Sequence, residues 1–130
     1  MLNRKAFLST LAAGLLMLAG AAQALTIKPY SAAALAAAQT EGTPVAVAFH
    51  ADWCPTCKAQ GKVFDGFKSD TALSKLTILV ADYDNEKALK KEMNIRTQST
   101  IVVFKGKSEV ARSAGVTEAA ALKTTLTTGL

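Results

Sequence analysis

Three short apolar runs limit the fold of this chain more than any other feature of its sequence. They are PVAVAFH at residues 44–50, TILVADYD at 77–84 and STIVVF at 99–104. Near-continuous apolar runs of this length are typical of strands that are buried on both faces of a sheet. Segments with helical patterns separate the runs. Neighbouring strands are therefore predicted to be parallel and to be joined by helices.

The remaining segments complete a predicted order of β-α-β-α-β-α-β-β-α. Pro29 limits a short extended segment at 26–30 to an edge position, and Gly106 marks a tight turn that forces one antiparallel pair. Helices are expected at 32–40, from the cysteines to about 69, at 85–93 and up to about Thr127, with Ser31, Asp70 and Thr117 as N-caps. The predicted fold class is α/β, a three-layer α/β/α sandwich with a mixed central sheet.

The first 24 residues resemble a secretory signal peptide. Arg4 and Lys5 form a basic start, FLSTLAAGLLMLAGA follows as an apolar core, and AQA at 22–24 offers a small-x-small cleavage pattern. Cleavage after Ala24 would leave residues 25–130 as one domain in an oxidising compartment, and the alanine-rich signal suggests the bacterial periplasm. The alternative is an uncleaved N-terminal membrane anchor. After cleavage, no membrane association is expected.

The charge balance does not indicate a nucleic-acid-binding protein. The chain of 130 residues has 15 Lys and Arg against 10 Asp and Glu, a net charge of +5. Loss of Arg4 and Lys5 with the signal lowers this to +3 (5 − 2). So small an excess, spread along the chain, gives no support to nucleic-acid binding.

The motif FHADWCPTCKAQ at 49–60 contains the only two cysteines, Cys54 and Cys57. Pro55 suits the first position of a helix, which makes Cys54 the expected N-cap and places Cys57 on the first turn. Sulfurs three residues apart there can close a disulfide. The helix dipole and free amides favour the Cys54 thiolate, so Cys54 is expected to attack disulfides and Cys57 to resolve the mixed disulfide.

VAVAFHADWCPTCKAQ at 45–60, ILVADYDNEKALKKEMNIRTQSTIVVFKG at 78–106 and the strand order resemble the thioredoxin superfamily. The segment ADWC…CK is most similar to thioredoxin and to the C-terminal domain of the periplasmic disulfide-reductase relay protein. The resemblance implies a thioredoxin-like fold over residues 25–130, with Cys54 as nucleophile, Cys57 as resolving thiol and Trp53 as a wall of the substrate-docking surface. It also implies protein thiols or disulfides as substrates, and a redox partner that resets the active site. The cofactor would be only the redox-active disulfide.

The chain departs from the superfamily pattern around the cysteines. Ser99 stands where the family has a cis-proline, so the Gln98–Ser99 bond is either a strained cis bond or a trans bond in a reshaped loop. In relatives this loop meets the substrate chain, which makes Gln98 and Ser99 substrate-docking candidates. Ala48 replaces the aspartate that thioredoxin buries beneath the resolving cysteine, and Val80 replaces its lysine partner. His50 stands in place of a tryptophan, and Asp52 is expected on the surface.

Three functions are compatible with the motif. The first is a periplasmic thiol–disulfide oxidoreductase, with Pro55, Thr56 and Lys58 tuning the redox potential and the direction of electron flow left open. The second is a copper(I)- or zinc-handling module with Cys54, Cys57 and His50 as ligands. The third is a binding or structural module in which the disulfide is only a staple, although so short a loop stabilises a fold little.

Overall fold

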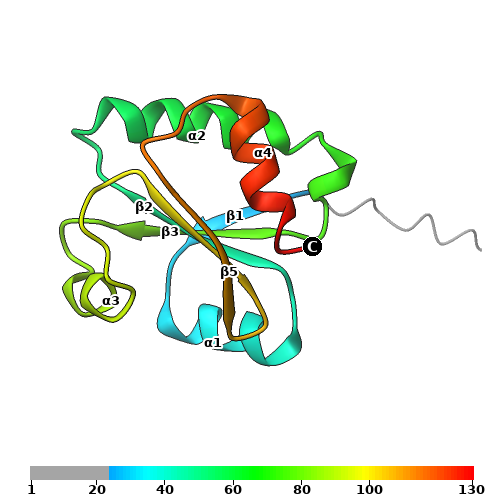
Figure 1. Cartoon of the computed structure of the whole chain (residues 1–130), viewed down its shortest axis with the longest axis horizontal. Helices are drawn as coiled ribbons and strands as arrows, with labels where there is room; N and C mark the ends of the chain where they lie inside the picture. Colours follow the sequence, from blue (N-terminus) through cyan, green and yellow to red (C-terminus); the bar gives the residue numbers. More distant parts are fainter. Residues whose placement is uncertain (1–23) are drawn as a thin grey trace, which may run out of the picture.

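The computed structural model describes residues 24–130, which form a five-stranded sheet between two layers of helices (Figure 1). The predicted fold class and the predicted order of elements are confirmed. In chain order the elements are β1 (Thr26–Pro29), α1 (Ala32–Glu41), β2 (Val45–His50), α2 (Pro55–Phe67), the short 3-10 helix η1 (Thr71–Leu73), β3 (Thr77–Asp82), α3 (Lys87–Glu92), β4 (Thr100–Lys105), β5 (Ser108–Ala114) and α4 (Ala119–Thr127).

The strands lie in the order β1-β3-β2-β4-β5, and the sheet is mixed as predicted. β1, β3 and β2 are parallel, whereas β4 is antiparallel to both β2 and β5. β1 is an edge strand, which suits Pro29 because proline has no N–H to donate to a second neighbour. Gly106 has a φ of 58° in the turn between β4 and β5, a conformation that glycine adopts without strain.

Side chains alternate between two cores, one on each face of the sheet. Ala46, Ala48 and Ile78 face the layer of α2 and α4, while Val45, Val47 and Phe49 face the layer of α1 and α3 (Figure 1). A strand points successive side chains to opposite faces, so an unbroken apolar run feeds both cores at once. The four phenylalanines that the sequence assigns to the core are all buried, namely Phe49, Phe64, Phe67 and Phe104.

The structure differs from the sequence prediction at the ends of several elements. β3 stops at Asp82 because its carboxylate accepts hydrogen bonds from the amides of Asp84 at 2.9 Å and Asn85 at 3.3 Å, which turns the chain. The predicted cap at Thr117 is wrong: α4 has Glu118 as N-cap, with no side-chain hydrogen bond to the helix. The caps at Ser31 and Asp70 are confirmed.

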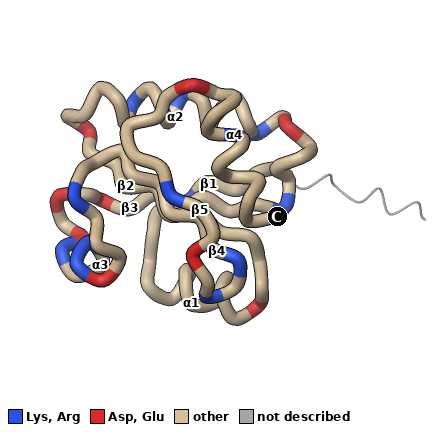
Figure 2. The backbone as a smooth tube through the Cα atoms, viewed as in Figure 1, with Lys and Arg blue, Asp and Glu red and all other residues tan. Residues whose placement is uncertain are grey.

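The predicted signal peptide lies outside the described residues except for Ala24. Within residues 24–130, no helix combines the length and the apolar character needed to cross a membrane. Lys and Arg are interspersed with Asp and Glu over the described elements, and α3 carries both signs (Figure 2).

Candidate active site

Cys54 caps the amino end of α2, the helix of the cysteine motif. It has an extended backbone, with φ −91° and ψ 111°, and Pro55 follows as the first helical residue. The Cys54 sulfur accepts a hydrogen bond from the amide of Cys57 at 3.1 Å. Here sulfur takes the place of the oxygen that a serine or aspartate cap provides. The predicted positions of both cysteines at the start of a helix are therefore confirmed.

The two thiols are free in this structure and have opposite acidities. Burial raises the pKa of Cys54, but hydrogen bonds from the Cys57 and Ser99 side chains and from the Cys57 and Thr56 amides outweigh this effect and lower the pKa overall. Burial and the Cys54 side chain raise the pKa of Cys57. Cys54 is thus the more acidic of the two thiols and Cys57 the less acidic, which is the order that attack by Cys54 and resolution by Cys57 require.

Ser99 lies directly against both sulfurs. Its hydroxyl oxygen is 3.0 Å from Cys57 Sγ and 3.3 Å from Cys54 Sγ, and the residue is 1% exposed. No peptide bond in residues 24–130 is cis, so the Gln98–Ser99 bond is trans. Instead, Ser99 has a φ of 61°, in the left-handed region that few residues other than glycine enter. Of the two predicted alternatives, the structure has the reshaped loop.

The backbone of Ser99 is fixed from three directions. Its amide donates to the carbonyl of Phe49 at the end of β2, at 2.9 Å, and its carbonyl accepts from the amide of Gly115 at 3.1 Å. The side-chain amide of Gln60 in α2 also donates to the Ser99 carbonyl at 3.0 Å and to the Val116 carbonyl at 2.8 Å. These bonds hold the left-handed conformation in place, and with it the hydroxyl.

The sequence interpretation missed Gln60. Gln60 is 3% exposed and follows Cys57 by one helical turn, on the face of α2 that also buries Phe64 and Phe67. A glutamine on an otherwise apolar helix face needs buried hydrogen-bond partners, because an unpaired amide in the core is costly. This pattern indicates a structural role for Gln60, but only the fold shows that its partners are the carbonyls of Ser99 and Val116.

A cavity of about 180 Å³ lies beside Cys57, beneath α2. Its lining includes Ala48 and Val80, which are direct neighbours in the β2–β3 register. These are the positions at which the resemblance to the thioredoxin superfamily would imply a buried aspartate and its lysine partner. The structure therefore has no ionisable side chain at either position. The lining residues that can ionise are Cys57, His50 and Asp65, of which Asp65 is exposed and paired with Lys68 at 2.8 Å.

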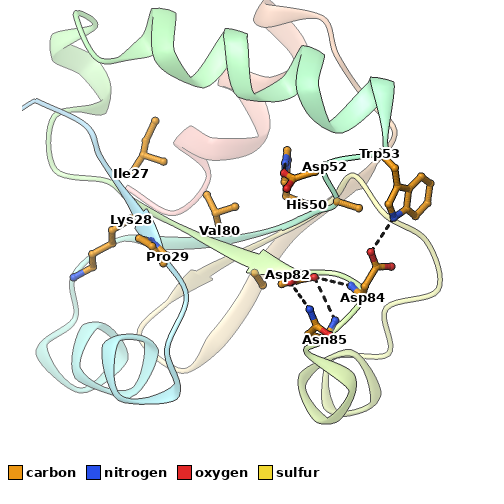
Figure 3. Close-up of a pocket in the computed structure, with 12 residues that line it drawn as sticks. Ile27, Lys28, Pro29, His50, Asp52, Trp53, Val80, Asp82, Asp84 and Asn85 are labelled. Atoms are coloured by element: carbon orange, nitrogen blue, oxygen red, sulfur yellow. Dashed lines mark hydrogen bonds and ion pairs between the residues drawn. The ribbon is translucent and has the colours of Figure 1, made fainter.

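A larger groove of about 480 Å³ lies on the Trp53 side of the cysteine motif (Figure 3). Trp53 is 59% exposed, and its indole nitrogen donates to Asp84 Oδ2 at 2.8 Å, which fixes the orientation of the ring. His50 Nε2 is 3.0 Å from Asp52 Oδ1, and Asp52 is exposed, as the sequence predicts. His50 lines both the groove and the cavity, so the two hollows are neighbours.

The other predicted site residues, in contrast to Ser99, make no side-chain hydrogen bond to either sulfur. Pro55 and Lys58 are exposed, and Thr56 acts on Cys54 through its backbone amide. Gln98 is half-buried and accepts a hydrogen bond from the Thr97 hydroxyl at 3.2 Å. In residues 24–130, no three His, Cys, Asp or Glu side chains are grouped closely enough to hold a metal ion.

Comparisons with known proteins agree with this geometry. The thioredoxin family model matches residues 28–128. The crystal structure of Trxlp from Edwardsiella tarda EIB202 is 36% identical, with a TM-score of 0.74 over 78% of this chain and 98% of that one. Thioredoxin from Chlamydia trachomatis is 31% identical over 72 residues, which are 55% of this chain and 69% of that protein. A thioredoxin from Malassezia sympodialis, at 24% identity and a TM-score of 0.69 over 79% of this chain and 92% of that one, shares the fold.

Some relatives are much longer than this chain. The bifunctional thioredoxin reductase/thioredoxin of Mycobacterium leprae is 30% identical over 98 residues, which are 75% of this chain but only 21% of that protein. The match therefore concerns only a part of that relative. The family model, in contrast, extends from β1 to the end of α4 and includes the cysteine motif. The chain belongs to the thioredoxin family of thiol–disulfide oxidoreductases, with Cys54 and Cys57 as its Cys-x-x-Cys pair.

Proposed function

We propose that this protein is a periplasmic thiol–disulfide oxidoreductase that exchanges electrons with the disulfides of other proteins. The observation that carries the proposal is the contrast between its two thiols: the pKa of Cys54 is lowered at the start of α2, and the pKa of Cys57 behind it is raised. A purely structural disulfide needs only two sulfurs close enough to bond. Thiol–disulfide exchange also needs one acidic thiol that attacks and a second, protonated thiol that resolves the mixed disulfide.

The reaction follows from this contrast. The Cys54 thiolate attacks one sulfur of a client disulfide, which releases the other client sulfur and leaves Cys54 joined to the client. Cys57 then attacks Cys54 Sγ, so the Cys54–Cys57 disulfide forms and the client leaves as a thiol. Two electrons have passed to the client. A reducing partner resets the pair, and the same steps in reverse would oxidise a client.

The exposed Trp53 ring is proposed as one wall of the client-docking surface. The hydrogen bond from its indole nitrogen to Asp84 fixes the orientation of the ring (Figure 3), and Trp53 directly precedes Cys54 in the chain. Cys54 itself is only 1% exposed, although Trp53 and Pro55 on either side of it are exposed. A docking client must therefore shift neighbouring groups to reach the sulfur. Gln98, next to Ser99, is proposed to meet the client chain on the opposite side.

Trapping with Cys57→Ser tests the proposal directly. This variant keeps the nucleophile but cannot resolve the mixed disulfide, so client proteins are expected to accumulate as adducts on Cys54 in the periplasm. Expressed with its full N-terminus, the variant should appear in the periplasmic fraction with Leu25 as first residue. The matched control is Cys54→Ser, which should trap nothing. Equal yields from both variants would contradict the assignment of Cys54, and retention of residues 1–24 on the membrane would support the uncleaved anchor.

A further inference from the structure

The hydroxyl of Ser99 bridges the two reacting sulfurs, although the residue was expected only to help dock the substrate. It lies 3.0 Å from Cys57 Sγ and 3.3 Å from Cys54 Sγ. A hydroxyl has one proton to donate and two lone pairs that accept. Between a protonated thiol and a thiolate, one arrangement uses both contacts of the hydroxyl: Cys57 donates to Ser99, and Ser99 donates to Cys54. The Cys57 thiol also lies 3.8 Å from the Phe49 carbonyl oxygen, which is a second acceptor for its proton.

We propose that Ser99 is a catalytic residue whose hydroxyl carries the proton of Cys57 to the client sulfur that leaves Cys54. This inference rests on the proposed function. In the mixed disulfide, the client sulfur is bonded to Cys54 Sγ at about 2.05 Å. The Ser99 oxygen is 3.3 Å from the same Sγ, so rotation about the Cβ–Oγ bond can turn the hydroxyl proton toward the client sulfur while the oxygen stays beside Cys57.

The step balances without any outside base. Cys57 Sγ forms a bond to Cys54 Sγ, and the bond between Cys54 and the client breaks, so the client sulfur leaves with the electron pair. The thiol proton of Cys57 moves to the Ser99 oxygen while the Ser99 hydroxyl proton moves to the client sulfur. The products are the Cys54–Cys57 disulfide and a client thiol, and Ser99 is regenerated as a hydroxyl.

Cys57 has no carboxylate at position 48 beneath it to accept its proton, so another group must do so. Its raised pKa means that it must lose a proton before it attacks, and the family's carboxylate position is filled by Ala48. Lys58 is exposed. Ser99 is the one residue in 24–130 whose side-chain oxygen or nitrogen is hydrogen-bonded to either sulfur. The left-handed backbone of Ser99, held by Phe49, Gln60 and Gly115, keeps the hydroxyl at both sulfurs.

Two matched variants distinguish the role of the Ser99 hydroxyl from the role of the loop conformation. Ser99→Ala removes the oxygen and keeps the strained backbone, whereas Ser99→Gly removes the oxygen and relieves the strain, because glycine enters the left-handed region freely. A role for the hydroxyl predicts the same defect in both variants. A role for the loop conformation alone predicts that Ser99→Gly behaves like the wild type. Thermal unfolding of each variant shows that the comparison is made on folded protein.

The readout is decay of the mixed disulfide, followed by acid quench and mass spectrometry after mixing reduced protein with a disulfide probe. With glutathione disulfide, the leaving alkyl thiol needs a proton, and both variants are expected to resolve the adduct about 10²-fold more slowly. With 5,5′-dithiobis(2-nitrobenzoate), the aromatic thiol leaves as the anion, since a leaving group of lower pKa leaves faster. The same variants should then slow by less than about 10-fold.

The outcomes are distinguishable. If wild-type protein forms no adduct on Cys54 with either probe, the proposed oxidoreductase function fails. If wild-type protein forms and resolves both adducts, but the variants match it, or lose the same factor with both probes, the proton relay alone is overturned. Titration of Cys54 by thiolate absorbance in a Cys57→Ser background gives a second readout: its pKa should rise equally in Ser99→Ala and Ser99→Gly.

Discussion

At the scale of single residues, Cys54 combines two tasks in one sulfur. Its sulfur caps α2 by accepting a hydrogen bond from the Cys57 amide at 3.1 Å, and it is the proposed nucleophile. The hydrogen bonds that stabilise the helix end therefore also stabilise the thiolate. When Cys54 is bonded to another sulfur, that negative charge is gone and its hydrogen bonds to the amides weaken. The cap is thus strongest in the reduced protein.

Gln60 supports the site without touching the sulfurs, and Gln60→Leu tests that role. The substitution keeps the volume but leaves the Val116 carbonyl without this donor, and it removes one of the two donors to the Ser99 carbonyl. We expect the free energy of unfolding to fall by about 1–3 kcal/mol in urea denaturation. The pKa of Cys54 should also rise, because Ser99 is less well held. Gln39→Leu in α1, on a partly exposed helix face, is the control and should stay within about 0.5 kcal/mol of wild type. Equal losses in both variants would contradict the role of Gln60.

Residue roles were predictable from the sequence where they depend on neighbours in the chain. The caps at Ser31, Cys54 and Asp70 follow from local patterns and are present in the structure. The contacts of Ser99 were not predictable, since they join a loop to the ends of β2, α2 and β5. Left-handed backbone at a serine has no sequence signal, and the departure from proline indicated only that the loop had changed.

At the scale of elements, the apolar runs predicted the strands well because burial on both faces leaves a continuous signature. Residues 45–49 of β2 are all buried, as the run VAVAF indicates. Element ends were less predictable, since they depend on which side-chain oxygen takes the free amides. At the end of β3 that group is Asp82, and at the start of α4 no side chain takes this role, although Thr117 was available.

The C-terminal turn packs closely against β4, and Gly129→Ala tests this contact. A Cβ at this position would lie 2.8 Å from Val103 Cγ1 and 3.3 Å from the Phe104 carbonyl oxygen. Val103 is fully buried and cannot move aside, so the free energy of unfolding should fall by about 1–3 kcal/mol.

The matched control is Gly66→Ala in α2. No atom lies within 4 Å of a Cβ built there, and the site is exposed. This variant should be more stable than wild type by about 0.5–1 kcal/mol, because alanine favours helix more than glycine does. Chemical denaturation measures the free energy of unfolding of both variants. If Gly129→Ala is as stable as wild type, the C-terminal turn does not pack on β4 as described.

At the scale of the whole molecule, the redox state and the stability of the fold are linked through Cys54. Its pKa is lowered in the folded protein, so the thiolate adds stability that is present above the unfolded pKa of about 8.5 and is lost as pH falls through the folded pKa. Only the reduced protein has this thiolate. The raised pKa of Cys57 acts in the opposite sense, but only as pH rises above about 8.5.

Reduced protein should therefore gain stability relative to oxidised protein as pH rises from the folded pKa of Cys54 to about 8.5. Urea denaturation of both redox forms across this range measures the difference, and Cys54→Ser/Cys57→Ser is the control for all other titrating groups. For a staple, the oxidised form would be more stable by a margin that does not change with pH. If the difference in unfolding free energy between the two redox forms stayed constant with pH, it would contradict a thiolate at Cys54.

The left-handed backbone of Ser99 also bears on how this loop is related to the proline loop of the family. Proline requires a φ near −65°, whereas Ser99 is at 61°, and proline lacks the N–H that Ser99 donates to Phe49. A single Ser99→Pro change would thus lose a hydrogen bond and force the chain onto a different path. Proline is therefore incompatible with the loop as it is built here, unless the segment around residue 99 also changes its conformation.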